Sequence, residues 1–241
     1  MKQTMIDTTL LAGSATEAID LSGYANSLLF SETAEEIEAA CIGDLARRRI
    51  AALKDATFSF TCADDDSGDP WDTLQDLFAA DGAHFGWVQS NSAMAEGDRG
   101  VMVEALETSY ARGGDVGALR TIQIAGNGNG PMIYARVLQQ DESLTVSGNS
   151  TGINFGALST GETLYCKQWV LSVTAGSIVG TIESDSSGGF SSPTTQATFT
   201  SASGTTTEEQ TVVGPQTDTW WRYEYTITTG PAVVLVMIGK K

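Results

Sequence analysis

The feature that most constrains this chain is the alternation of apolar and polar residues in short runs that end at glycine, asparagine or serine. In residues 56–61, alanine and two phenylalanines alternate with threonine and serine, and Trp221, Tyr223, Tyr225 and Ile227 repeat with the same period of two. This alternation is typical of a strand with one buried and one solvent-facing side. The chain is therefore predicted to be mainly β.

Further strands are expected wherever the same pattern recurs between turn residues. They are predicted at residues 26–30, 85–89, 101–110, 119–125 and 132–138. Residues 232–238 are apolar at both alternating positions, which predicts a central strand of a sandwich, buried on both faces.

One short helix is expected after the acidic run that begins at Asp64. Asp69 has the side chain of an N-cap, Pro70 suits the first turn, and Gly82 can end the helix in a left-handed conformation. The residues at helical spacing that would face a sheet are Trp71, Leu74, Leu77 and Phe78.

Composition divides the chain into two parts. Residues 1–141 hold 22 acidic and 9 basic residues, whereas residues 142–241 hold 8 and 4, and the sequence near 139–148 becomes rich in serine, threonine and glycine. We therefore expect a domain of barrel or sandwich type over 1–141, with one flanking helix and an N-terminal arm. A C-terminal β-sandwich domain is expected over 142–241.

Two segments are expected to need a partner. Residues 1–19 are polar and weakly patterned, which predicts an arm that becomes ordered only when something holds it. The connection between the strands at 26–30 and 56–61 is too long for a tight hairpin and too apolar for a solvated loop. It should fold back on its own subunit or dock on another.

The charge of the chain limits its partners. The formal net charge is −17 and the sequence pI is about 4.2, so nucleic-acid binding through a basic patch is not expected. The one basic cluster is Arg47, Arg48 and Arg49 with Lys54. It is either a solvated run of charge or, in a self-assembling protein, a contact to the carboxylates of a neighbouring subunit.

No motif of catalysis or cofactor binding is expected to operate. His84 is the single histidine and no GxSxG sequence occurs, while the GNGNG segment at 126–130 lacks the lysine and the helix of a phosphate loop. The acidic run at 64–69 lacks the order of a calcium-binding loop. We expect no enzyme activity, no metal and no cofactor.

The cysteines and the hydropathy indicate the compartment. Cys41, Cys62 and Cys166 have no paired spacing, so reduced thiols in a cytosolic compartment are expected. No stretch has the length of a signal peptide or of a bilayer span, so no membrane association is expected.

Several segments in a fixed order resemble one known family. They are DLSGYANSLLF (20–30), CIGDLARRRIAALKDATFSFT (41–61), the helix and VMVEALETSY (101–110). Together they resemble the major tail proteins, or tail tube proteins, of long-tailed bacteriophages. The most specific matches are Gly43-Asp44 and the segment 52–55, where Ala52 replaces the glycine of the family's GLKD-like pattern. In the second half, residues 180–184 and 233–241 resemble the family's second domain.

The resemblance implies a structural virion protein of the phage tail, assembled in the host cytoplasm. Homohexameric rings, in which every subunit adds strands to a continuous inner barrel, would stack into a tube that conducts DNA into the host. The acidic balance of the chain would make that conduit negatively lined. The implied partners are further copies of this chain, the terminator, tape measure and distal tail proteins, and transiently DNA.

The family's inter-ring contacts correspond here to residues 1–18 and 39–54. The contact residues implied are Ile42, Gly43, Asp44, Leu45, Arg47, Arg48, Arg49 and Lys54.

The lumen of such a tube would be lined by the polar half of the alternating strands. If Ala56, Phe58 and Phe60 face a core, the opposite face predicts these lumen residues: Thr57, Ser59, Thr61, Thr121 and Gln123. Two other functions stay open. One is a carbohydrate-binding or adhesion module that uses Trp220, Trp221, Tyr223 and Tyr225, although core packing explains these aromatics better. The other is a head-decoration or connector protein of a virion.

Overall fold

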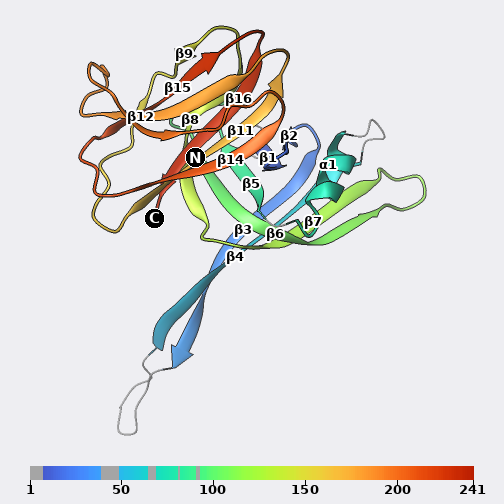
Figure 1. Cartoon of the computed structure of the whole chain (residues 1–241). Coiled ribbons are helices and arrows are strands. Elements are labelled where there is room, and N and C mark those ends of the chain that lie inside the picture. Colours follow the sequence, from blue (N-terminus) through green and yellow to red (C-terminus); the bar gives the residue numbers. More distant parts are fainter. Residues whose placement is uncertain (1–7, 39–48, 65–68, 81, 91–92) are drawn as a thin grey trace, which may run out of the picture.

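The computed structural model describes residues 8–38, 49–64, 69–80, 82–90 and 93–241. This part of the chain is mainly β with one short helix, as the alternation predicts (Figure 1). The elements in chain order are β1 (Thr8–Ser14), β2 (Glu17–Asp20), β3 (Ala25–Glu38), β4 (Arg49–Ala63), α1 (Asp69–Leu77), β5 (Ala83–Gln89), β6 (Arg99–Gly113), β7 (Thr121–Gly128), β8 (Ile133–Leu144), β9 (Gly148–Asn149), β10 (Ile153–Asn154), β11 (Thr163–Val173), β12 (Ile178–Asp185), β13 (Thr194–Thr198), β14 (Thr206–Val213), β15 (Trp220–Ile227) and β16 (Ala232–Lys240).

The strands form two sheets whose ladders are antiparallel. The smaller sheet has the order β10-β15-β12-β13, with β9 also beside β15. The larger sheet runs β14-β11-β16-β8-β6-β5-β1-β2 and carries a branch, β6-β7-β4-β3. The branch exists because β6 is long. Its residues 99–105 pair with β5, and its residues 105–113 pair with β7.

The larger sheet curls until its two ends meet, but it does not close into a barrel. The hydroxyl of Thr206 in β14 donates to the carbonyl oxygen of Ala15 at 2.8 Å. The hydroxyl of Thr207 donates to the carbonyl oxygen of Glu17 at 3.2 Å. Side chains therefore hold the two ends together where a backbone ladder would otherwise run.

The first hydrophobic core lies between the branch strands and β1, β5 and β6, and α1 closes one side of it. Phe58 packs on Phe85 with ring centroids 4.2 Å apart, and Leu74 and Leu77 of α1 are buried in the same cluster. Three consecutive positions of β4 on this side, Ala56, Phe58 and Phe60, are buried. This confirms the predicted core face of the strand.

Two further cores explain why the centre of the larger sheet is apolar on both faces. The sandwich core lies between the smaller sheet and β8, β11, β14 and β16, and it buries Trp221 and Tyr223 completely. The middle core, on the opposite face of β11 and β16, holds Trp169 and Met237. The prediction that residues 232–238 form a central strand is confirmed, since β16 lies between β11 and β8.

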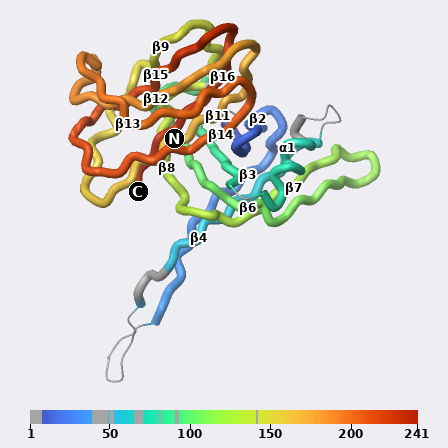
Figure 2. The backbone as a smooth tube through the Cα atoms, viewed as in Figure 1, coloured from blue at the N-terminus to red at the C-terminus, as the bar shows by residue number. Residues whose placement is uncertain are grey.

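The two segments predicted from composition share one sheet. β8 spans the boundary at residue 141 and pairs with β6 on one side and with β16 on the other. Figure 2 follows the tube from one segment into the other through these strands. The division at residue 141 stays a prediction about folding units.

The structure corrects two expectations from the sequence. Residues 8–18 do not form a loosely held arm, because β1 pairs with β5 and β2, and Leu10 and Leu11 are fully buried on its two faces. The helix begins at Asp69 as predicted but ends at Leu77 instead of Gly82. It ends early because Ala79 turns left-handed, with φ of 58°, and donates its N–H to the carbonyl oxygen of Glu107 in β6.

Candidate assembly surface

The branch of the larger sheet has one buried and one uncovered face. We call the four-stranded part made of β3, β4, β7 and residues 107–113 of β6 the assembly sheet. On its inner side Phe60 and Ile124 pack into the first core. On its outer side the register brings Ser27, Thr61, Gln123 and Ala111 into one row across the four strands.

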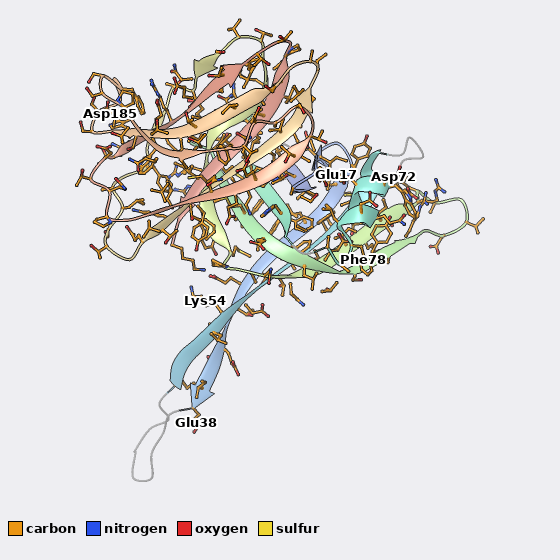
Figure 3. The ribbon with its side chains drawn as sticks, in the orientation of Figure 1. Glu17, Glu38, Lys54, Asp72, Phe78 and Asp185 are labelled. Carbon is orange, nitrogen blue, oxygen red and sulfur yellow. The ribbon has the colours of Figure 1, made fainter. Side chains whose placement is uncertain are left out.

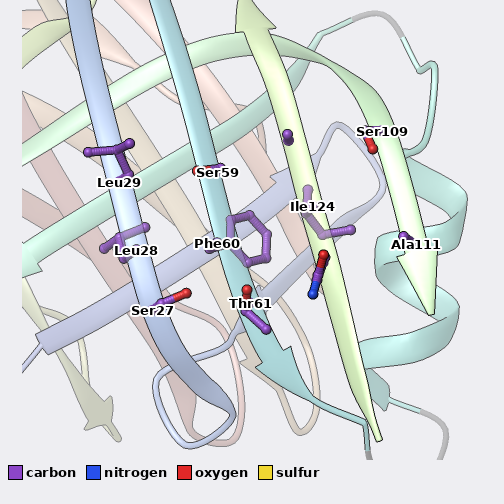
Figure 4. Close-up of a pocket in the computed structure, with 11 residues that line it drawn as sticks. Ser27, Leu28, Leu29, Ser59, Phe60, Thr61, Ser109, Ala111 and Ile124 are labelled. Carbon is purple, nitrogen blue, oxygen red and sulfur yellow. The ribbon is translucent and has the colours of Figure 1, made fainter. Parts of the chain in front are cut away.

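The outer face of the assembly sheet consists of small and polar side chains and one exposed leucine, Leu29, which is 61% exposed (Figure 4). They line a shallow depression of about 330 Å³ on that face. The residues that share this face by register and alternation are Ser27, Leu29, Ser31, Thr57, Ser59, Thr61, Ser109, Ala111, Thr121, Gln123, Ala125 and Asn127.

All five predicted lumen residues belong to this outer face. Thr57, Ser59 and Thr61 alternate with the buried residues of β4, and Thr121 and Gln123 alternate with those of the neighbouring β7. None of these twelve side chains is charged. Whether the conduit is negatively lined stays a prediction. Exposed Asp55, two residues before Thr57, lies on the same side of β4 and carries a carboxylate toward the tip of the strand.

The assembly sheet ends at two strands that lack a second neighbour in the described part of the chain. β3 pairs with β4 alone. Residues 109–113 of β6 pair with β7 on one side and have no strand on the other. Each unpaired edge presents backbone N–H and C=O groups that another strand can bond.

The tips of β3 and β4 project from the body as a two-stranded ribbon (Figures 1 and 2). We call its described residues, 33–38 and 49–55, the arm. Ile37 and Leu53 on the arm are 52% and 81% exposed, because no other described part of the chain covers a ribbon that projects from the body. Figure 3 shows Lys54 near the base of the arm and Glu38 toward its tip.

Ion pairs within the chain hold the basic residues of the arm. Arg49 lies 2.9 Å from Glu36, and Lys54 lies 3.4 Å from Glu32. Glu32 also accepts a hydrogen bond of 2.9 Å from Lys241 near the end of β16. That hydrogen bond, together with the charges of Lys241 and Lys54, holds the pKa of Glu32 below its usual value. The base of the arm is thus tied to the C-terminal segment.

Of the contact residues that the family resemblance implies, Arg49 and Lys54 are placed on the arm. The others lie outside the described residues: Ile42, Gly43, Asp44, Leu45, Arg47 and Arg48. The role of all eight in contacts between subunits stays a prediction.

The opposite end of the assembly sheet is held by a buried carboxylate. Asp64, just after β4, accepts hydrogen bonds from Arg112 of β6 and lies 3.4 Å from the guanidinium of Arg120. The guanidinium of Arg112 also lies 3.5 Å from the ring centroid of Trp71 in α1. The first carboxylate of the acidic run therefore fixes the β6–β7 hairpin.

The single histidine is a half-buried residue of β5. Its Nδ1 is 2.8 Å from Nζ of Lys167, which is itself 2.9 Å from a carboxylate oxygen of Glu209. Burial, and secondarily the charge of Lys167, lowers the pKa of His84 to about 3. In the described ranges no three metal-ligating side chains gather into a site, and no helix is long and apolar enough to cross a membrane.

The aromatic platform considered for sugar binding does not form. Trp221 and Tyr223 face the sandwich core, whereas Trp220 and Arg222 face outward on the other side of β15. Adjacent residues of a strand point to opposite faces, so these aromatics cannot share one surface.

Sequence reasoning missed the outer-face residues contributed by β3 and β6. Ser27 and Leu29 alternate within the predicted strand at 26–30, and that alternation was the available signal. The face of Ser109 and Ala111 could not be predicted, because a bulge between Glu107 and Ser109 shifts the alternation of β6 by one residue.

Comparison with solved structures finds proteins of virions and tails. The chain is similar to a protein of the virion of a native gene transfer agent particle, with 14% identity, coverage of 55% of this chain and 98% of that chain, and a TM-score of 0.44. It is also similar to a protein of the tail of an empty gene transfer agent particle solved with six-fold symmetry, with 14% identity, the same coverages and a TM-score of 0.42.

A third similarity extends over nearly the whole chain. The SPP1 Dit protein (gp 19.1), described as a paradigm of the hub adsorption apparatus in phages that infect Gram-positive bacteria, is 11% identical. The match covers 97% of this chain and 99% of that chain, with a TM-score of 0.35. No protein-family model and no curated protein matches the sequence.

Proposed function

We propose that this chain is a structural protein of a phage tail whose copies form hexameric rings that stack into the tail tube. The observation that carries the proposal is the assembly sheet, a four-stranded sheet that has, among the described residues, one uncovered face without charged side chains and two edges without a neighbouring strand. The edge of β3 on one copy pairs with the edge of β6 on the next. This contact joins two different surfaces, so repetition closes a ring when the rotation fits.

Strand pairing between neighbouring copies would favour assembly of the ring. In a monomer the outward edges of β3 and of the end of β6 have no neighbouring strand among the described residues, and in a closed ring the next copy supplies one. The outer faces of six assembly sheets then form one continuous wall inside the ring. Residues 142–241, with the smaller sheet, stand on the outside of the tube.

The chemistry of the wall suits passage of DNA. Hydroxyl, amide and small apolar side chains offer no cation that would hold a phosphate, and the net charge of −17 repels the polyanion from the rest of the surface. We propose that this wall, within a ring of negatively charged subunits, lets the DNA pass into the host without sticking.

The arm provides the contact between rings. It leaves the body at the end of the assembly sheet and exposes Ile37 and Leu53, which the next ring covers. The assembled tube belongs to the tail of the virion, is built in the host cytoplasm, and meets terminator, tape measure and distal tail proteins at its ends and in its interior.

The edge pairing is tested with engineered cysteines. Within one chain, β3 and β6 are separated by β4 and β7, a distance of about 14 Å across three strand spacings, and a disulfide needs Cα atoms within about 7 Å. A disulfide in the Leu29→Cys, Ala111→Cys variant, or in a neighbouring register such as Ser27→Cys, Ala111→Cys, must therefore join two copies.

The expected product is a ladder of linked species that ends at the hexamer on a non-reducing gel. The single variants Leu29→Cys and Ala111→Cys are the matched controls and should give no ladder beyond a dimer. A ladder that ends at another number would indicate a connector or decoration protein of different symmetry. Monomers alone in every register, with micrographs free of rings at high protein concentration, would overturn the proposal.

A further inference from the structure

We propose that Asn129 is a site of spontaneous deamidation in the folded protein and that Asn127, two residues earlier, is protected. The segment reads Gly126-Asn127-Gly128-Asn129-Gly130, so each asparagine precedes a glycine. A following glycine presents no side chain to hinder attack by its own backbone nitrogen. The two asparagines therefore have the same local chemistry, and the fold distinguishes them.

The reaction needs only the chain and water. The backbone nitrogen of Gly130 forms a bond to Cγ of Asn129, the bond from Cγ to Nδ2 breaks, and Nδ2 leaves as ammonia with the proton of the backbone amide. The resulting five-membered imide is opened by water at either carbonyl carbon. The product is aspartate or isoaspartate, with one more negative charge and no change in oxidation state.

Asn127 is held in a ladder on both sides. It lies in β7, opposite Thr57 of β4 and opposite Leu106 of β6. The next residue is crowded, since a Cβ at Gly128 would lie 2.8 Å from the Cβ of Ala56. Ring closure at Asn127 requires the extended backbone to rotate, so both pairings must open first.

Asn129 lies just beyond the end of β7, and its side chain is exposed. Its own N–H donates to the carbonyl oxygen of Glu104 at 2.8 Å, but in the part of the chain that is described the amide of Gly130 donates no backbone hydrogen bond. A Cβ placed on Gly130 would meet no atom within 4 Å. The attacking nitrogen and the space around it are therefore open.

The modification changes one specific contact. Nδ2 of Asn129 donates to Oε1 of Glu104 at 3.2 Å, and the product places a carboxylate where that donor was. Glu104 also borders a cavity of about 50 Å³ with Lys167 and Glu209. Deamidation thus adds a negative charge beside the carboxylate of Glu104 and weakens the tie between β6 and the segment that leads to β8.

The test follows both asparagines in the full-length protein during incubation in mildly alkaline buffer, by peptide mapping with mass spectrometry. In the folded protein Asn129 should convert at least about tenfold faster than Asn127, since the ladder must open before Asn127 can react. In urea-unfolded protein the two rates should become similar. Equal rates in the folded protein, or faster conversion of Asn127, would overturn the proposal, as would an Asn129 that converts only after unfolding.

A matched variant confirms the route of the reaction. Gly130→Ala fits without contact, and the backbone of Gly130 is not left-handed, so the melting temperature should stay unchanged while conversion of Asn129 slows. An unchanged rate in Gly130→Ala would rule out attack by the Gly130 nitrogen. Asn129→Asp, which mimics one product, should melt at a lower temperature than Asn129→Gln, which keeps an amide. Equal melting of these two variants would contradict the proposed loss of the Glu104 contact.

Discussion

Nζ of Lys167 in β11 lies 2.8 Å from Nδ1 of His84 in β5. The two residues are far apart in the sequence. Their contact brings β5 against β11 at a point where Lys167 is only 1% exposed. Lys167 also pairs with Glu209 of β14 at 2.9 Å. The neutral imidazole therefore accepts a hydrogen bond from the lysine, and three strands from both halves of the chain meet at one buried ammonium group.

Removal of that ammonium group should destabilise the whole chain. Lys167→Met leaves Glu209 without its cation and His84 without its donor, and we expect a loss of about 2–4 kcal/mol in the free energy of unfolding. Urea unfolding near neutral pH measures it. Glu209→Gln, which keeps an acceptor for Lys167, is the control and should cost less. A Lys167→Met variant as stable as the unsubstituted chain would show that the cluster contributes nothing.

His84 should contribute to loss of stability in acid. Its folded pKa of about 3 lies below the ordinary value of 6.5, so the unfolded chain binds a proton that the folded chain does not. Folding is therefore weakened as pH falls from 6.5 toward 3, by about 1.4 kcal/mol per pH unit. His84→Gln should remove this part of the pH dependence, as seen by comparing unfolding curves from pH 7 down. Parallel curves for the two proteins would contradict the prediction.

Glu107 should have the opposite pH dependence. Its side chain is 1% exposed, both carboxyl oxygens lack hydrogen-bond partners among the described residues, and burial raises its pKa to about 8. The folded state then holds a proton that the unfolded state has lost, so stability falls as pH rises from 4.5 to about 8. Glu107→Gln should be more stable than the unsubstituted chain by about 5 kcal/mol in alkali and nearly equal in acid.

Chemical unfolding at several pH values measures the effect of Glu107→Gln. Glu36→Gln, an exposed carboxylate on the arm, is the control and should give no such difference. The interpretation of Glu107 fails if its variant shows the same pH dependence as the unsubstituted chain.

A shortened arm should separate ring formation from tube formation. Thr33 and Asp55 face each other in the ladder, so residues 34–54 can be replaced by an Asn-Gly turn between them. The body keeps its cores, and the melting temperature should change little. Micrographs should show rings but no tubes, because the contact between rings is gone. Tubes of ordinary length from this variant would remove the arm from the proposed mechanism.

Reversal of charge at Arg47, Arg48 and Arg49 should block assembly without unfolding the subunit. The pair between Arg49 and Glu36 is exposed, with side chains 58% and 64% accessible, so its loss should cost at most about 1 kcal/mol. Assembly is followed by electron microscopy and stability by thermal melting.

An exchange of charges distinguishes the two roles of Arg49. The double variant Glu36→Arg, Arg49→Glu restores the pair within the chain but reverses the charge offered to a neighbour. We expect it to assemble no better than Arg49→Glu alone. Rescue of assembly by the exchange would show that Arg49 acts within its own arm.

The sequence by itself determined the local structure wherever one residue pattern admits one environment. Alternation at Ala56, Phe58 and Phe60 predicted the buried face of β4, and the apolar run at 232–238 predicted a central strand, because side chains of a strand alternate between faces and burial of apolar surface selects one of them. Asp69 and Pro70 likewise predicted where the helix begins, because its first turn favours these residues.

Only the tertiary structure decided which strands meet. Residues 8–18 are held in the sheet because β1 pairs with β5, more than 60 residues later. The end of the helix depends on a backbone contact to β6. In the sequence, nothing distinguishes Lys167 and Glu107 from exposed charged residues. They are buried because strands distant along the chain pair with one another. The uncharged assembly face required the register of β3, β4, β7 and β6 together with one bulge. A sequence pattern records which face of a strand is apolar, whereas partner and register arise from contacts between residues distant along the chain.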